Sequence, residues 1–78
     1  MDELDFELRG EYIPLDALLK ATGLAPSGGS ARMLITEGQV LVDGQAELRK
    51  TCKIRAGQRV SLGDVRVNVR GAAGDASG

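Results

Sequence analysis

The spacing of hydrophobic residues changes once along the chain, near Gly38. Before this residue, apolar side chains recur every three or four positions, as they do on one face of an amphipathic helix. After it, they alternate with polar side chains, as they do in a half-buried strand. Phe6 and Leu8 also alternate with Glu7 and Arg9 near the start, which predicts a short strand there. The expected order is a short strand, two helices and several strands.

Two helices are expected in the first half. Pro14 suits the first position of a helix, because its missing N–H would have no partner there, and Gly23 supplies a stop. Pro26-Ser27 announces a second helix that Ser27 can cap and that Gly38 ends. A short loop joins the two, which makes a helix-turn-helix arrangement. The residues expected to face the core are Leu15, Leu18 and Leu19 of the first helix and Ala31, Leu34 and Ile35 of the second.

The second half is expected to form a small curled antiparallel sheet on which the two helices pack. Val40-Leu41-Val42 precedes Asp43-Gly44, a dipeptide that favours a tight hairpin turn. A second hairpin is predicted at Gly63-Asp64, with Gly at the position where a type II′ turn requires it. On the strands around that turn, the side chains expected to face the core are those of Val60, Leu62, Val65, Val67 and Val69. Helices followed by an antiparallel sheet define the α+β class.

The length of 78 residues is that of one domain. We expect this domain to cover residues 1–70. Residues 71–78 are expected to be a disordered tail, because they offer nothing large to bury. With one Phe, one Tyr and no Trp, the core must consist of Leu, Val, Ile and Ala.

Several kinds of chemistry are excluded by composition. The chain has no His, which removes imidazole catalysis, and its single Cys excludes an internal disulfide and a cysteine-based zinc site. No apolar run approaches the length of a transmembrane helix, and the acidic N-terminus is unlike a signal peptide. We therefore expect a cytoplasmic, non-enzymatic domain that uses no cofactor and no metal.

The net charge of −1 hides an uneven distribution. Residues 1–16 carry six acids against Arg9 alone, whereas residues 17–70 carry a net charge of +5. Five cations fall within eleven positions with no acid between them, a density that favours contact with phosphates. They are Arg49, Lys50, Lys53, Arg55 and Arg59. The alternative is a solvated hairpin that aids solubility and pairs with the acidic N-terminus.

The start of the second helix is a further candidate for phosphate contact. Ser27-Gly28-Gly29 would present free amides at the positive end of a helix dipole, and two glycines let a phosphate approach the backbone closely. Arg32 would project from the outer face of the same helix. The alternatives are that Gly28 and Gly29 only make a tight turn between the helices, with Ser27 as an ordinary cap, and that Arg32 is a solvated charge.

The segment from Leu15 to about Leu62 resembles the alpha-L RNA-binding domain first seen in ribosomal small-subunit protein S-four. The matching motifs lie within residues 14–62. They are Leu15-Asp16 with Leu18-Leu19, Ser27-Gly28-Gly29-Ser30-Ala31, Gly38-Gln39-Val40-Leu41-Val42-Asp43-Gly44 and Ala56-Gly57-Gln58-Arg59-Val60. The Ser-Gly-Gly form and the stretch from Glu47 to Lys53 look most like the stand-alone YbcJ-like proteins. Pro14 and Gly28 stand where the family often has arginines that contact RNA.

This resemblance implies a stand-alone protein that recognises structured RNA such as ribosomal or transfer RNA. We expect this protein to be a monomer and to have no membrane partner. The residues expected at the interface are Ser27, Gly28, Gly29 and Arg32 on the helix, and Arg49, Lys50, Lys53 and Arg55 on a basic rim. No aromatic residues interleave with the rim, so contacts with shape and phosphates are expected rather than base stacking. Tyr12 is the one residue suited to stacking, but a lone Tyr at a helix entry is more often a packing residue. Cys52 is interpreted as half-buried or as a mildly activated thiol.

Two other functions are compatible with the sequence. One is a protein-interaction module whose basic rim binds an acidic partner surface. The other is a DNA-reading winged helix-turn-helix, which normally has three helices before its hairpin where this pattern predicts two.

Overall fold

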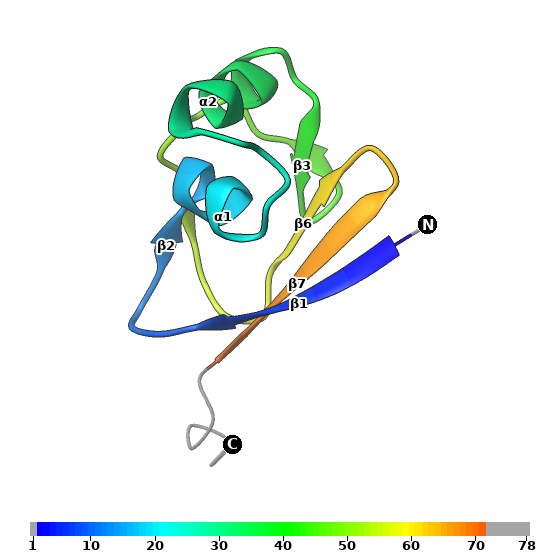
Figure 1. The fold of residues 1–78 in the computed structure, drawn as a ribbon. Helices are drawn as coiled ribbons and strands as arrows, with labels where there is room; N and C mark the ends of the chain where they lie inside the picture. The colour runs from blue at the N-terminus through cyan, green and yellow to red at the C-terminus, as the bar shows by residue number, and fades with distance from the viewer. Residues whose placement is uncertain (1, 72–78) are drawn as a thin grey trace.

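The computed structural model describes residues 2–71, which form two helices and seven strands (Figure 1). In chain order these are β1 (Asp2–Leu8), β2 (Ile13–Pro14), α1 (Leu15–Ala21), α2 (Gly28–Thr36), β3 (Val40–Val42), β4 (Gln45–Ala46), β5 (Lys53–Ile54), β6 (Arg59–Leu62) and β7 (Val65–Gly71). Five strands form one sheet in the order β1-β7-β6-β3-β4, and β2 pairs with β5 in a second sheet. The α+β class is confirmed.

The main sheet is mixed, whereas an antiparallel sheet was expected. β1 pairs in parallel with β7, with Asp2 opposite Val65 and Leu8 opposite Gly71, while the other neighbours in this sheet are antiparallel. The strand near the start is therefore longer than the alternation from Phe6 predicted. Gly71 ends β7 instead of beginning a tail, and the rest of the predicted tail lies outside the described residues.

Both helices begin and end near the predicted signals. Pro14 is the N-cap of α1, so the helix starts one residue later than expected. Ser27 caps α2, and its hydroxyl oxygen accepts a hydrogen bond from the amide of Ser30 at 3.2 Å. The C-cap residues, Thr22 and Glu37, come directly before the two glycines that were expected to stop the helices.

Two tight turns shape the antiparallel part of the sheet. Asp43 and Gly44 both have positive φ, at 53° and 86°, which is the requirement of the type I′ turn between β3 and β4. Gly63 has a φ of 61° at the turn between β6 and β7, so the predicted glycine position is confirmed.

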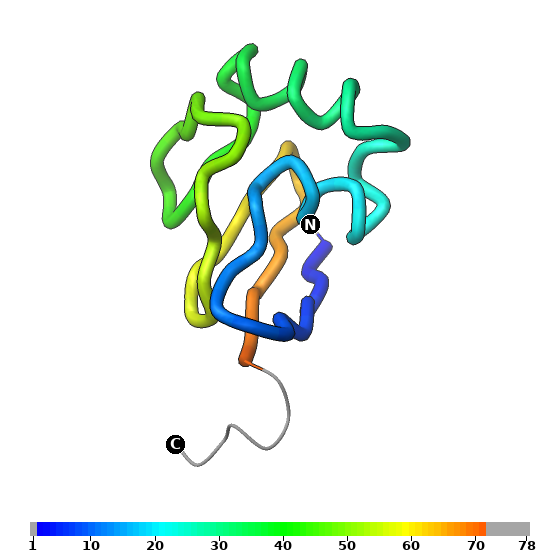
Figure 2. Tube along the Cα trace, turned by 90° about the vertical axis from the view of Figure 1, so that its left-hand side faces the viewer, coloured from blue at the N-terminus to red at the C-terminus, as the bar shows by residue number. Residues whose placement is uncertain are grey.

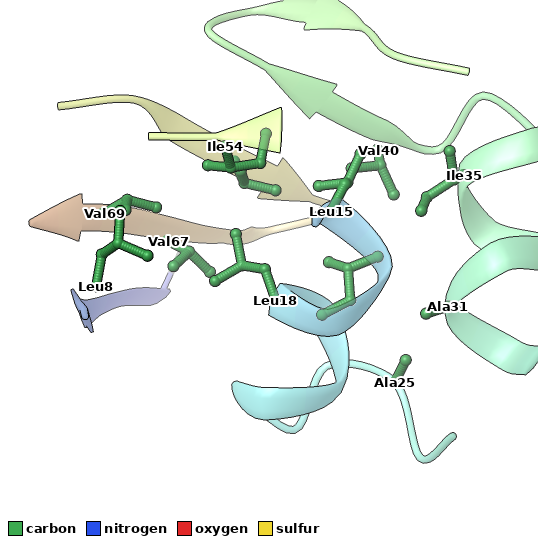
Figure 3. Packing of buried hydrophobic residues seen from close by; sticks show 12 residues of the cluster. Leu8, Leu15, Leu18, Ala25, Ala31, Ile35, Val40, Ile54, Val67 and Val69 are labelled. Atoms are coloured by element: carbon green, nitrogen blue, oxygen red, sulfur yellow. The ribbon is translucent and has the colours of Figure 1, made fainter. Parts of the chain in front are cut away.

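One core joins both helices to the inner face of the sheet (Figure 3). Leu15 and Leu18 of α1 lie between the strands on one side and Ala31 of α2 on the other. The small Ala31 is completely buried at this position, which lets the two helices approach closely. The buried residues are Leu8, Leu15, Leu18, Leu19, Ala25, Ala31, Ile35, Val40, Ile54, Val60, Val67 and Val69. Burying each Leu, Ile or Val contributes roughly 1.5–3 kcal/mol.

Candidate nucleic-acid interface

The first residues of α2 leave backbone amides accessible. Gly28 and Gly29 are the first two residues of the helix, so the expected alternative of a tight interhelical turn is wrong. Neither has a positive φ, and a Cβ at Gly28 or Gly29 would lie 3.7 Å or 3.9 Å from its nearest neighbour, an ordinary contact. The fold itself therefore requires glycine at neither position. Within residues 2–71, neither glycine amide donates a hydrogen bond.

Arg32 lies one turn further along α2 and connects this helix to α1. Its Nε is 3.4 Å from the Oδ2 of Asp16, and its Nη2 lies 3.7 Å from the position of a Cβ on Gly28. The guanidinium thus sits beside the open end of α2. More than half of the Arg32 side chain remains exposed, so it can also reach a ligand.

The segment from Arg49 to Lys53 is anchored on the start of α1. The amide of Leu15 donates to the carbonyl of Cys52 at 2.9 Å, and that of Asp16 donates to the carbonyl of Lys50 at 3.1 Å. Lys53 of β5 also pairs with Pro14 of β2, and Figure 2 shows the segment before α1 and the segment that contains β5 side by side. These backbone contacts fix the lysines at the same end of α1 that holds Arg32.

Asp16 is the residue that joins the two halves of this surface. Its side chain holds Arg32, its amide holds the Lys50 carbonyl, and its Oδ1 accepts from the amide of Ala17 at 2.8 Å. The sequence pattern predicted no such role for Asp16. Its place in the first turn of α1, where the helix dipole favours a carboxylate, was the available signal.

The residues Arg49, Lys50, Lys53 and Arg55, which we call the basic rim, are all exposed. Arg49 is partly neutralised, because its Nε and its amide both donate to the Oε2 of Glu47, at 3.0 and 3.1 Å. These two hydrogen bonds lower the pKa of the Glu47 carboxyl below its ordinary value. Within residues 2–71, no acid lies within 4 Å of the charged groups of Lys50, Lys53 and Arg55.

The predicted interface residues are not all brought together. Arg55 lies in the turn after β5, where its amide donates to the Gln58 side chain at 2.7 Å, and no described contact links it to α2. Arg59, the last cation of the sequence cluster, lies in β6 among residues of a different surface. The rim and α2 therefore meet at Arg32, Lys50 and Lys53, with Arg49 and Arg55 further out along the chain.

Arg59 belongs to the sheet face that points away from the core, which we call the outer sheet face. It carries Arg59, Ser61, Arg66, Asn68 and Arg70, together with Glu3 and Asp5 of β1. Glu3 lies 3.4 Å from Arg66, and Asp5 lies 3.6 Å from Arg70. These two acids of the N-terminal segment thus pair with the sheet and not with the basic rim.

The structure also shows the surroundings of Tyr12 and Cys52. Tyr12, interpreted as a packing residue or a stacking residue, is exposed, and its ring lies 5.0 Å from the ammonium of Lys53. Cys52 is half-buried as expected. Burial raises the pKa of its thiol, and the nearby Glu47 carboxylate adds to this rise. The structure thus argues against an activated Cys52.

A family model of the S4 domain matches residues 6–70. The chain belongs to the S4 domain family. It is 50% identical over 58 residues to YbcJ of Escherichia coli strain K12, named as a candidate RNA-binding protein, with 74% of this chain and 83% of the relative covered. YbcJ of Shigella flexneri matches with the same identity and coverage.

The solution structure of E. coli YbcJ shares this fold. It has a TM-score of 0.69 and 44% identity, covers 90% of each chain, and is described as revealing an alpha-L motif involved in RNA binding. The resemblance to the alpha-L family and to YbcJ-like proteins is thus confirmed. In the part of the chain that the structure describes, no helix is long and apolar enough to span a membrane.

Proposed function

We propose that this protein is a stand-alone, non-enzymatic RNA-binding protein of the cytoplasm. It binds structured RNA as a monomer, through the amide-rich start of α2 and the basic rim. The observation that carries the proposal is the arrangement around Asp16, which gathers Arg32, Lys50 and Lys53 near one end of α1. The RNA-binding motif described for E. coli YbcJ supports it.

The chemistry of this surface favours phosphates as the main contact. Lysines without an acidic neighbour release counterions when they meet a polyanion, which is the chief source of affinity for nucleic acid. The open amides of Gly28 and Gly29 lie at the positive end of the α2 dipole and can donate to a phosphate oxygen. Contact with phosphates recognises the shape of a folded RNA, and transfer RNA and ribosomal RNA are therefore the ligands to test first.

Binding of labelled transfer RNA and of a labelled RNA hairpin tests the proposal. We expect affinity for both at low salt, and a logarithmic salt slope of about 0.7–0.9 for each phosphate contact. An acidic polypeptide serves as the competitor, because the alternative function is recognition of an acidic protein surface. Absence of RNA binding at low salt, or stronger binding of the acidic polypeptide than of RNA, would overturn the proposal.

The double variant Gly28→Ala with Gly29→Ala tests the part assigned to α2. Alanine is the better helix former, by up to about 1 kcal/mol per residue, and both Cβ atoms would make only ordinary contacts. The new methyl groups should nevertheless hinder approach to the amides. We expect a higher melting temperature together with RNA binding several-fold weaker, measured by calorimetry and by titration. Unchanged affinity would show that the glycine amides take no part in binding.

A further inference from the structure

We propose that Tyr12 and the hollow beside Lys53 together bind one unpaired nucleotide of the RNA. The base stacks on the Tyr12 ring, and its phosphate lies in the hollow beside Lys53. This inference rests on the proposed function and deepens it, because it names a feature that the preferred RNA must have. In the sequence, stacking was only the alternative interpretation of Tyr12, and no hollow beside it was predicted.

The hollow lies within the basic rim. It has a volume of about 390 Å³ and is lined by Arg49, Thr51, Cys52 and Lys53. This volume falls in the range of about 300–1,000 Å³ that is usual for sites of small ligands. Two of its four residues are cations, and the hydroxyl of Thr51 is a further donor. Such a lining suits a phosphate group and the sugar attached to it.

Tyr12 provides the aromatic surface. Tyr12 is 41% exposed, although it directly precedes β2, which packs against the core through Ile13. The Lys53 ammonium lies 5.0 Å from the centre of the ring, within the range of a cation–π contact. Lys53 therefore belongs both to the hollow and to the neighbourhood of the ring. A nucleotide bound at Lys53 would have its base within reach of Tyr12.

The Lys53 ammonium can exchange its contact with the Tyr12 ring for a contact with a phosphate. A phosphate that enters the hollow competes with the ring for the Lys53 ammonium, because an ion pair is stronger than an exposed cation–π contact. Once the ammonium turns to the phosphate, the ring is free to stack on a base. Bases inside a duplex are already stacked on both sides, so only an unpaired base can use the site. A regular duplex would touch the rim through its phosphates alone.

The experiment compares two RNA hairpins that differ at one position. One has an uninterrupted stem, and the other carries a single bulged 2-aminopurine, whose emission reports stacking. We expect the wild-type protein to bind the bulged hairpin about tenfold more tightly, within the range known for one base stacked on an aromatic ring. The 2-aminopurine emission should be quenched in the complex.

Two variants of Tyr12 separate stacking from other effects. Tyr12→Phe keeps the aromatic face and should keep both the preference and the quenching. Tyr12→Ala should lose both, with the affinity for the uninterrupted hairpin unchanged. Met33→Ala is the matched control, because Met33 is also an exposed apolar residue, at 61%, but lies on α2. It should behave as wild type, and circular dichroism checks that all variants are folded.

The outcomes distinguish this inference from the proposed function. Equal binding of both hairpins without quenching would overturn the nucleotide site and leave the RNA-binding function in place. Loss of the preference in Tyr12→Phe would also overturn it, because stacking does not need the hydroxyl. Failure of the wild-type protein to bind either hairpin would overturn both.

Discussion

The basic rim and the outer sheet face carry similar numbers of cations, but these cations have different neighbours. On the sheet, Arg66 pairs with Glu3 of β1 at 3.4 Å, and Arg70 pairs with Asp5 of β1 at 3.6 Å. On the rim, Arg49 has Glu47, whereas Lys50, Lys53 and Arg55 have no acid within 4 Å among residues 2–71. The comparison teaches that the number of cations in a stretch of sequence does not give the charge that a ligand meets.

The origin of the difference lies in the topology. The parallel pairing of β1 with β7 places Glu3 directly opposite Arg66, so the most acidic segment of the chain neutralises the sheet. The rim is carried by a segment that packs on α1 through its backbone. Among residues 2–71, only Asp16 and Glu47 form ion pairs with the cations of the rim and of α2. Arg66 and Arg70 are therefore paired with acids of the neighbouring strand, while Lys50, Lys53 and Arg55 keep their charge available.

The largest expected effect comes from removing two charges from each surface in turn. Lys50→Gln with Lys53→Gln should weaken RNA binding about a hundredfold, roughly tenfold for each lost charged contact, and should reduce the salt slope by about 0.7–0.9 per contact. Arg66→Gln with Arg70→Gln changes the net charge equally and should weaken binding less than about threefold. Titrations of labelled RNA at several salt concentrations measure both. Equal losses in the two double variants would mean that only net charge matters, and the comparison would fail.

The variant Asp43→Ala tests whether an acid beside the sheet stabilises the fold without taking part in RNA binding. Its Oδ1 accepts from the amide of Arg59 at 3.0 Å, and its Oδ2 accepts from the Gln58 side chain at 3.2 Å. Asp43→Ala loses both bonds and places alanine at a φ of 53°, so we expect a loss of about 2 kcal/mol in the free energy of unfolding. RNA binding by the folded protein should not change. Urea denaturation measures the first quantity and titration the second.

The variant Asp43→Asn gives this prediction a pH dependence. The Arg59 amide, followed by the Gln58 side chain, lowers the pKa of the Asp43 carboxyl below its ordinary value of 3.8. The charged form is thus favoured by folding, and its contribution is complete above pH 3.8 and is lost as the pH falls through the lower, folded-state pKa. The stability difference between wild type and Asp43→Asn should therefore narrow below this pH. A difference independent of pH would show that the charge of Asp43 contributes nothing.

The features that the sequence predicted correctly are local ones. The Ser27 cap, the glycines after each helix and the two hairpin turns depend on a few neighbouring residues, so their patterns could be recognised directly. The parallel pairing of β1 with β7 joins residues more than sixty positions apart, and no local pattern specifies the direction of such a pairing. The antiparallel sheet expected in the second half is confirmed for β3, β4, β6 and β7, whereas the parallel addition of β1 was not predicted for that reason.

The candidate site was predicted in part, for the same physical reason. The five clustered cations share one stretch of sequence, but the turn after β5 carries Arg59 to the outer sheet face. Asp16 had no predicted partner, because its contact with Arg32 depends on how α1 and α2 pack. Tyr12 was interpreted first as a packing residue, since a lone Tyr at a helix entry often packs there, and its contact with Lys53 had no local signal. Which of these residues contact RNA stays a prediction.

A smaller effect is expected from freeing the arginines of the sheet. Glu3→Gln with Asp5→Gln removes the acids that form ion pairs with Arg66 and Arg70, and should tighten RNA binding about threefold with a steeper salt slope. Because both ion pairs are exposed, the stability should change by less than about 1 kcal/mol. Asp2→Asn with Asp64→Asn is the control, since it changes the net charge equally without breaking a described ion pair. If the control tightens binding as much, pairing is not what keeps the sheet from binding.

The smallest expected effect concerns Arg49, the rim residue that most resembles the sheet arginines. Glu47→Gln removes the charge that holds its Nε and should tighten RNA binding about twofold. The salt slope is the sharper measurement, because it should rise by about 0.7–0.9 if the released guanidinium gains one phosphate contact. Glu37→Gln is the matched control, since Glu37 is an exposed acid bonded to Gln39 and away from any arginine contact. An unchanged slope in Glu47→Gln would place Arg49 with Arg66 and Arg70, as a cation that serves the fold, and would narrow the binding surface to the lysines, Arg32 and Arg55.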